Sequence, residues 1–137
     1  MIVLDTSGLL AALDRGEREH SRVRRALDSA PGPLLVLDLV LAETDFLVLK
    51  RLGRKAERAF LDQLIDGTLH REALRDTDLR RAREIVARFD DQAIGLTDAA
   101  LMAVAERLEA PVLTLDRRHF VSFRTRKGKP LVLLPQS

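Results

Sequence analysis

The sequence contains no cysteine, tryptophan or tyrosine, and phenylalanine occurs only five times in 137 residues. Without cysteine the chain has neither a disulfide framework nor a thiolate metal site, which fits a cytosolic protein. With so few aromatic side chains, we expect recognition of any nucleic acid to depend on phosphates and shape rather than on base stacking. No apolar run approaches the length of a membrane span, and the first residues, MIVLDTS, have neither the basic region nor the cleavage site of a signal peptide. These absences favour a cytoplasmic globular protein with no membrane partner.

Charged residues are abundant in the sequence, at 32%. The net charge is only +2, but the basic residues gather in four groups: Arg22, Arg24 and Arg25; Lys50, Arg51, Arg54 and Lys55; Arg80, Arg81 and Arg83; and Arg124, Arg126, Lys127 and Lys129. Such groups make a polyanionic partner plausible, although any one of them is more simply explained as the solvated outer face of a helix. The length predicts a single domain, residues 1–137, that buries roughly two thirds of the surface of the unfolded chain.

Residues 95–120, GLTDAALMAVAERLEAPVLTLDRRHF, contain the clearest structural pattern. Thr97 is predicted to be a helix N-cap, which places Asp98 in the first turn of a helix with one apolar face. Pro111 follows the end of this helix, and residues 112–115 read as a short apolar strand that ends at Asp116.

The start of the chain repeats this arrangement. Residues 2–4 form a short apolar run that ends at Asp5, and a helical pattern follows over residues 8–13. Continuous apolar runs that alternate with helices are typical of a parallel sheet covered on both faces, so the sequence predicts an α/β fold. Ligands bind beyond the carboxyl ends of the strands in such sheets, which is where Asp5 and Asp116 would lie.

The remaining pattern predicts helices over residues 17–30, 39–52, 54–65 and 77–89, and strands over residues 34–37, 69–74 and 131–134. The strand pattern over residues 69–74 is weak, so this strand is expected at an edge of the sheet. Asp38 is expected to be the N-cap of the helix over residues 39–52. In the helix over residues 77–89, Leu79 is expected to face inward. The helix over residues 39–52 is apolar on more than one face. It should therefore be buried on several sides, or should present part of its surface to another chain.

Four acids could meet at the sheet edge: Asp5, Glu43, Asp98 and Asp116. Two unit charges about 5 Å apart repel by roughly 3 kcal/mol at an effective dielectric constant of 20, so a cluster needs protonation or a bound cation. Oxygen ligands, without cysteine or clustered histidine, favour Mg²⁺ or Mn²⁺ over zinc. Hydrolysis of a phosphodiester bond is chemistry that such a cation supports.

Each acid also has a structural interpretation. Asp98 could complement a helix dipole, Asp5 could lead into a turn, Asp116 could cap the next turn, and Glu43 could pair with Lys50. A common edge for all four is harder to explain in this way. The three histidines share no ligand spacing and are expected to be surface or packing residues: His20, His70 and His119.

The segments IVLDTSGLLA, VLAETDFLVLKRLG, GLTDAALMAVAERL and VLTLDRRHF occur in this order through nearly the whole chain. Together they resemble the PIN-domain ribonucleases, in particular the VapC-like toxins of type II toxin–antitoxin modules. The resemblance implies a Rossmann-like fold with a central parallel sheet of four to five short strands, and an acidic Mg²⁺ site that hydrolyses RNA. It also implies a homodimer and a small antitoxin protein whose tail lies across the active-site groove.

By the same resemblance, Asp5 and Asp98 would be the principal metal ligands, Glu43 would complete the site or hold a water, and Asp116 would be the fourth catalytic acid. Thr6 would occupy the family's small hydroxyl position. His119 stands where many relatives have a further acid, so a site with five acids is not expected.

Two other classes share some of these features. An acidic-pocket phosphatase or a phospho-receiver domain also has a parallel sheet with aspartates at strand ends, but Thr6 and Ser7 stand where a phosphatase would place a second aspartate. A non-catalytic RNA-binding module is the third class. Loss of one of the four acids would favour it, and all four are present.

Overall fold

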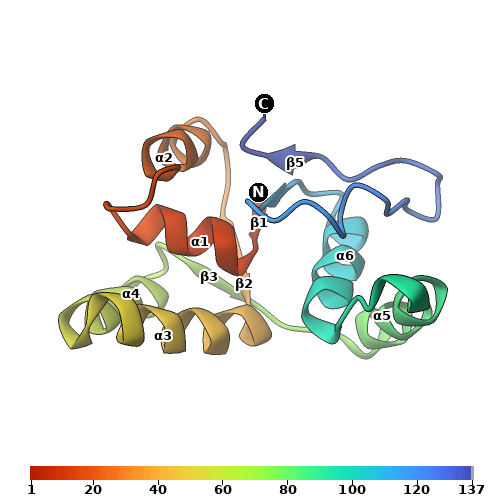
Figure 1. Cartoon of the computed structure of the whole chain (residues 1–137), viewed down its shortest axis with the longest axis horizontal. Helices are drawn as coiled ribbons and strands as arrows, with labels where there is room; N and C mark the ends of the chain where they lie inside the picture. The colour runs from red at the N-terminus through yellow and green to blue at the C-terminus, as the bar shows by residue number, and fades with distance from the viewer. Residues whose placement is uncertain (137) are drawn as a thin grey trace.

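The structure, a computed structural model, describes residues 1–136. A five-stranded parallel sheet lies in its centre with helices on both sides (Figure 1), so the predicted α/β class is confirmed. The strands are β1 (Ile2–Leu4), β2 (Leu34–Leu37), β3 (His70–Glu72), β4 (Val112–Leu113) and β5 (Leu133–Leu134). The helices are α1 (Thr6–Leu13), α2 (His20–Asp28), α3 (Asp38–Leu52), α4 (Arg54–Asp66), α5 (Asp76–Arg88), the short 3₁₀ helix η1 (Asp90–Gln92) and α6 (Leu96–Leu108).

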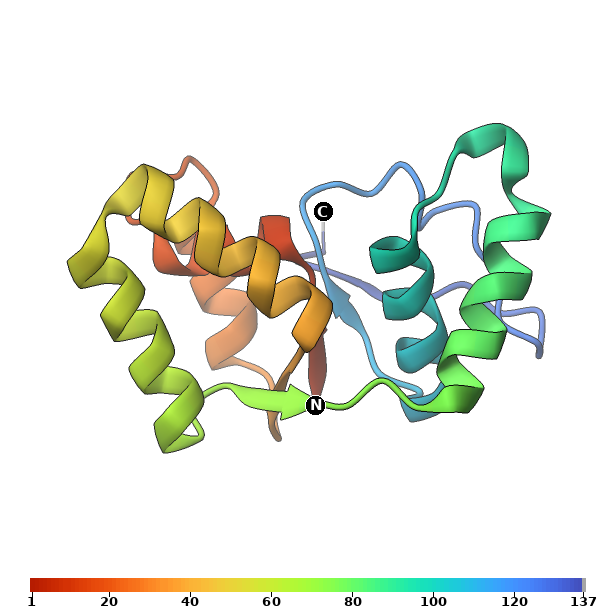
Figure 2. The same ribbon diagram turned by 90° about the horizontal axis from the view of Figure 1, so that it is seen from below.

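The strand order is β3-β2-β1-β4-β5, and all neighbouring strands are parallel. Helices α1 to α4 lie on one side of the sheet and α5 and α6 on the other, as the two views show (Figures 1 and 2). The chain leaves β1 toward β2 and β3, and then returns to place β4 on the opposite side of β1. The order therefore reverses between β1 and β4, which is where open parallel sheets form a ligand-binding crevice.

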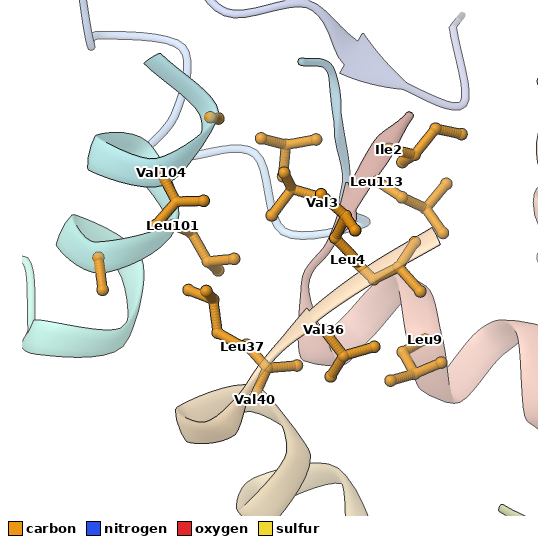
Figure 3. Close-up of a cluster of buried hydrophobic side chains, with 14 of the residues drawn as sticks. Ile2, Val3, Leu4, Leu9, Val36, Leu37, Val40, Leu101, Val104 and Leu113 are labelled. Atoms are coloured by element: carbon orange, nitrogen blue, oxygen red, sulfur yellow. The ribbon is translucent and has the colours of Figure 1, made fainter. Parts of the chain in front are cut away.

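The centre of the core is β1, whose side chains Ile2, Val3 and Leu4 are all almost completely buried. Figure 3 shows them among apolar side chains from β2, β4 and the surrounding helices, including Leu9 of α1 and Leu101 of α6. Because both faces of β1 are covered, an uninterrupted apolar strand is the sequence that this position requires.

The helix embedded in the core is α6, whereas α3 is covered on one side only. Every residue of α6 from position 99 to position 105 is buried, and α6 lies between the sheet and α5. In α3 the buried residues are Val40, Thr44 and Val48, and Phe46 is 62% exposed. The prediction that α3 is buried on several sides is therefore wrong for the isolated chain. Alanine-rich α6 can fit closely between two layers because its side chains are small.

Two helix starts differ from the prediction. Helix α6 begins at Leu96 with Gly95 at the N-cap, so Thr97 lies inside the first turn instead of capping it. Helix α3 begins at Asp38 itself, after Leu37 at the N-cap. The Asp38 carboxylate is taken by Arg71 of β3, at 3.0 and 3.1 Å, and so does not cap the helix.

The edges of the sheet are short. The edge strands are β3, as predicted, and β5, and β5 and its inner neighbour β4 are each only two residues long. The prediction that Leu79 faces inward is wrong, since Leu79 is exposed on α5 and its neighbour Asp78 is buried. Asp78 accepts hydrogen bonds from the amide of Arg75, the N-cap of α5, and from the side chain of Arg107 on α6. Within residues 1–136, every helix is too short or too polar to traverse a lipid bilayer.

Candidate active site

A cavity of about 360 Å³ opens at the carboxyl ends of β1 and β4, where the strand order reverses. The first turns of α1 and α6 line it, together with one side of α3. We call it the acidic cavity because six carboxylate residues line it: Asp5, Asp14, Glu17, Glu43, Asp98 and Asp116. All four acids predicted from the sequence are thus at one cavity. Of the described residues that line it, Arg51 is the sole basic one.

Asp5 is the most deeply placed of these acids, with 7% of its surface exposed. It directly follows β1 and caps α1, since its Oδ1 accepts a hydrogen bond from the Thr6 amide at 2.8 Å. Its Oδ2 accepts from the Thr114 hydroxyl at 2.7 Å. The pKa of Asp5 is raised to about 6, mainly by burial; the two hydrogen bonds lower it, and the nearby charges of Asp98 and Glu43 add to the increase. Asp5 is therefore an acid whose negative charge the folded protein stabilises poorly.

Asp98 lies in the first turn of α6, and its carboxylate is held from the loop that follows β4. The His119 Nδ1 atom lies 2.7 Å from Asp98 Oδ2. His119 had been expected to be a surface or packing residue, and it instead contacts one of the predicted site acids.

Thr114 links the two strand ends. It is fully buried, and besides donating to Asp5 its hydroxyl accepts from the Asp116 amide at 3.1 Å and lies 3.0 Å from the Asp116 carbonyl oxygen. Ser7 adds a second link, because its Oγ accepts from the Leu115 amide at 2.9 Å. These bonds hold the loop that carries Asp116 against the start of α1.

A glycine makes this close approach possible. A Cβ atom at Gly8 would lie only 2.7 Å from the carbonyl oxygen of Leu113 and 2.8 Å from its side chain. Helix α1 therefore packs on β4 at a distance that no larger residue allows at position 8. Ser7 and Thr114 can face each other for this reason.

Glu43 reaches the cavity from the exposed side of α3. Among the ion pairs of residues 1–136, none joins Glu43 to Lys50, whose Nζ lies 5.9 Å from the centre of the Phe46 ring. The structural interpretation of Glu43 as the partner of Lys50 is thus not supported. Asp116 does have a basic partner, Arg118 at 3.3 Å, but both side chains are largely exposed.

The carboxylates line one cavity but are not grouped tightly around a single point. Across residues 1–136, no three aspartate, glutamate, histidine or cysteine side chains are grouped closely enough to hold a metal. Asp5 is bonded to Thr6 and Thr114, and Asp98 contacts His119, so both side chains are held in defined orientations while their oxygens keep lone pairs that an ion can use. The donor set still fits a hard divalent cation, since it consists of oxygens. In the part of the chain that the structure describes, the buried hydroxyl of Thr6 also has no hydrogen-bond partner, although Thr6 lines this cavity.

Several residues at the site were missed from the sequence. Thr114 and Ser7 belong to motifs that were recognised, but their hydrogen bonds depend on the approach of α1 to β4. Asp14 and Glu17 lie on the turn after α1, which the sequence pattern assigned to helix and loop without any role. The position of His119, three residues after Asp116, was noted as that of a further acid in many relatives, but its contact with Asp98 was not predicted.

Comparison with known proteins gives a consistent result. The family model for the PIN domain matches residues 2–124. The chain is 38% identical over 135 residues to Ribonuclease VapC26 of Mycobacterium tuberculosis, an alignment that covers 98% of this chain and 100% of that protein.

Among solved structures, the chain is similar to VapC20 of Mycobacterium tuberculosis, described as a sarcin-ricin loop cleaving toxin. The TM-score is 0.77 at 24% identity, covering 87% of this chain and 92% of that one. It is also similar to a chain of a toxin–antitoxin complex from Klebsiella pneumoniae, with a TM-score of 0.69 at 19% identity and coverage of 90% and 92%. At these identities the structures establish a common fold.

Proposed function

This chain belongs to the PIN-domain family, and from that premise we propose that it is a metal-dependent endoribonuclease that acts as the toxin of a toxin–antitoxin pair. The observation that carries the proposal is the acidic cavity at the crevice between β1 and β4. Of the described residues that line it, six are carboxylates and one, Arg51, is basic. A full-length relative named as a ribonuclease supports the choice of RNA as substrate.

We assign the four predicted acids to the cation and the reaction. Asp5 and Asp98 are the principal metal ligands, from the end of β1 and the start of α6. Asp116 and Glu43 complete the ligand set, Glu43 from the exposed side of α3, where it can hold the attacking water or accept its proton. The buried Thr6 hydroxyl, which has no partner within residues 1–136, would be available to donate to a ligand carboxylate or a water when the cation is bound.

The cation we propose is Mg²⁺, with Mn²⁺ as a substitute, because both prefer oxygen ligands. When bound, such an ion neutralises charge on the phosphoryl group and activates water. The chain's own contribution is to hold several carboxylates at one place with little basic compensation. Arg51, at the cavity wall, is placed to contact a phosphate of the RNA backbone.

The partners we propose are an antitoxin and a second copy of the chain, in the cytoplasm. Exposed apolar side chains support a protein partner: Phe46 and Leu49 on α3, and Leu61 and Ile65 on α4, of which Ile65 is 83% exposed. Apolar side chains gathered on two neighbouring helices are typical of a surface that contacts another protein.

The test is cleavage of total RNA, with new 5′ ends identified by sequencing, so that no substrate has to be guessed. We expect cleavage by wild type with Mg²⁺ and none with EDTA. Asp5→Asn and Asp98→Asn should lower the rate at least about a hundredfold, as loss of transition-state charge stabilisation typically does. Asp62→Asn, on the exposed side of α4, is the matched control and should leave the rate unchanged.

Cleavage that persists in EDTA, or in the Asp5→Asn protein, would contradict the proposal. RNA binding without cleavage, under every metal condition, would favour the non-catalytic RNA-binding module instead.

A further inference from the structure

Asp98 is held on one side by a histidine that does not itself line the acidic cavity. The His119 Nδ1 atom lies 2.7 Å from Asp98 Oδ2, and both side chains are between one quarter and one third exposed. Asp98 and Asp116 both line the cavity, whereas His119 is not among its lining residues. The imidazole therefore approaches Asp98 from outside the cavity.

The hydrogen bond leaves one carboxylate oxygen available. With Asp98 ionised, its carboxylate can only accept hydrogen bonds, and the contact requires the His119 tautomer whose Nδ1 atom carries the hydrogen. Among the hydrogen bonds of residues 1–136, none engages the other oxygen, Oδ1 of Asp98. A carboxylate tied at one oxygen has lost most of its freedom to rotate, and the remaining oxygen is presented in a defined direction.

The loop that carries His119 is anchored independently of this bond. Phe120 and Phe123, on either side of a tight turn, are almost completely buried, and the Val121 amide donates to the Arg117 carbonyl oxygen at 3.0 Å. The two phenylalanines hold the loop on the core. His119 is thus presented by a rigid support, and the loop does not depend on the partly exposed pair with Asp98 for its position.

We infer that His119 is a positioning residue that orients the Asp98 carboxylate so that its free oxygen can bind the divalent cation. The inference rests on the proposed function, because it assumes that Asp98 is a metal ligand. Outer partners of metal ligands typically change metal affinity by about 10- to 100-fold when they are removed.

The chain offers a matched pair of substitutions for the test. The side-chain amide of asparagine places an N–H close to the position of the histidine Nδ1 atom, whereas that of glutamine reaches the position of Nε2. We would titrate wild type, His119→Asn and His119→Gln with MnCl₂ alone by calorimetry, and record the thermal unfolding of each metal-free protein. The expected result is a Kd for Mn²⁺ about tenfold higher or more in His119→Gln, a Kd near that of wild type in His119→Asn, and similar metal-free melting temperatures.

Three results would overturn the inference, and they are distinguishable. If wild type binds Mn²⁺ and His119→Gln binds it equally well, only the role of His119 is wrong. If both variants bind less tightly to the same extent, and both melt lower without metal, His119 is a structural residue. If wild type does not bind Mn²⁺, the proposed metal site fails, and the inference fails with it.

Discussion

Two aspartates of this protein are almost equally buried and have opposite pKa shifts. Asp5, in the acidic cavity, is 7% exposed, and Asp78, at the start of α5, is 3% exposed. Burial raises the pKa of Asp5 to about 6. Burial also acts to raise the pKa of Asp78, but two hydrogen bonds from Arg107 and one from the Arg75 amide outweigh it, so the pKa is lowered. Two things differ: Asp5 has only a hydroxyl and an amide as partners, and its carboxyl group is more strongly desolvated than that of Asp78.

The same contrast extends to the surroundings of each residue. Two groups of ion pairs lie along α5 and α6, and together we call them the α5–α6 ion-pair network. In the first, Arg107 pairs with Asp78 and Glu72. In the second, Arg81 pairs with Glu84 and Glu106, and Arg126 of the C-terminal loop pairs with Glu84. The acidic cavity is lined by six acids and, among the described residues, by one arginine, Arg51. Buried charge is thus neutralised by the chain itself in one region and is left for a ligand in the other. The first arrangement stabilises the fold, and the second is what a cation site requires.

The largest expected effect on stability comes from replacing Arg107, the arginine that pairs with the buried Asp78. Arg107→Met leaves Asp78 buried without its charge partner, and Glu72 loses its contact with Arg107 at 3.2 Å. Breaking such a pair typically costs about 3 to 5 kcal/mol, which urea unfolding at pH 7 would measure. A loss below about 1 kcal/mol would mean that the network does not stabilise the fold.

The second effect is a dependence of stability on pH that originates at Asp5. The pKa of Asp5 is about 6 in the folded protein and 3.8 in its reference state, so the folded state binds this proton more tightly. The tighter binding of this proton stabilises the folded state by roughly 3 kcal/mol. This stabilisation is fully present below about pH 4 and is lost as the pH rises through about 6. In EDTA, the free energy of unfolding should therefore rise from pH 8 to pH 5. Asp5→Asn cannot titrate and should lack this rise; if it keeps the rise, the assignment to Asp5 is wrong.

The opposite trend should follow at lower pH. Asp78 and Glu106 have lowered pKa values, because the arginines beside them outweigh their burial. Their stabilisation is lost as the pH falls below the ordinary carboxylate range. The metal-free protein should thus be most stable near pH 5.

A smaller effect is expected at Thr114. Thr114→Val removes the hydroxyl that donates to Asp5 and bonds to the Asp116 backbone, at a cost of about 1 to 2 kcal/mol at pH 8. Without this donor the pKa of Asp5 should rise further, so the midpoint of the pH profile should move upward. Thr114→Ser retains the hydroxyl and is the control. The two variants should differ in stability and in the midpoint of the pH profile. Identical profiles would mean that the Thr114 hydroxyl does not influence the pKa of Asp5.

The smallest effect is expected where a pair is exposed. Arg24 lies 3.4 Å from Asp28 on α2, and about half or more of each side chain is in solvent. Arg24→Met should change the free energy of unfolding by less than about 1 kcal/mol in the same urea experiment. A change as large as that of Arg107→Met would mean that burial does not decide the difference between pairs.

Much of the fold follows from the sequence because its signals are local. Apolar runs that end in aspartate predicted the strands β1 and β4, and the alternation with helices predicted the parallel sheet. Burial of whole helices did not follow in this way. The apolar pattern of α3 suggested a core helix, but burial depends on neighbours, and the alanines of α6 let that helix fit between the sheet and α5.

The site was predictable in its location and not in its contacts. Parallel topology is enough to bring Asp5, Asp98 and Asp116 to one edge, and all three line the acidic cavity. Their roles in metal binding stay predictions. His119 and Thr114 could not be assigned, because their hydrogen bonds join segments far apart in the sequence. The buried Asp78 was missed for the same reason, since its partner Arg107 lies on another helix.

The most direct test of the central claim compares the two aspartates in one measurement. Thermal unfolding of wild type, Asp5→Asn and Asp78→Asn would be recorded at pH 7.5, each with EDTA and with excess MnCl₂. Without metal, Asp5→Asn should melt higher than wild type by roughly 3 °C or more, because a poorly stabilised charge is removed, and Asp78→Asn should melt lower. Mn²⁺ should stabilise wild type and Asp78→Asn alike and leave Asp5→Asn nearly unchanged. If Asp5→Asn instead melts lower than wild type and gains the same stabilisation from Mn²⁺, the acids of the cavity are structural and the claim that they are kept for a cation is contradicted.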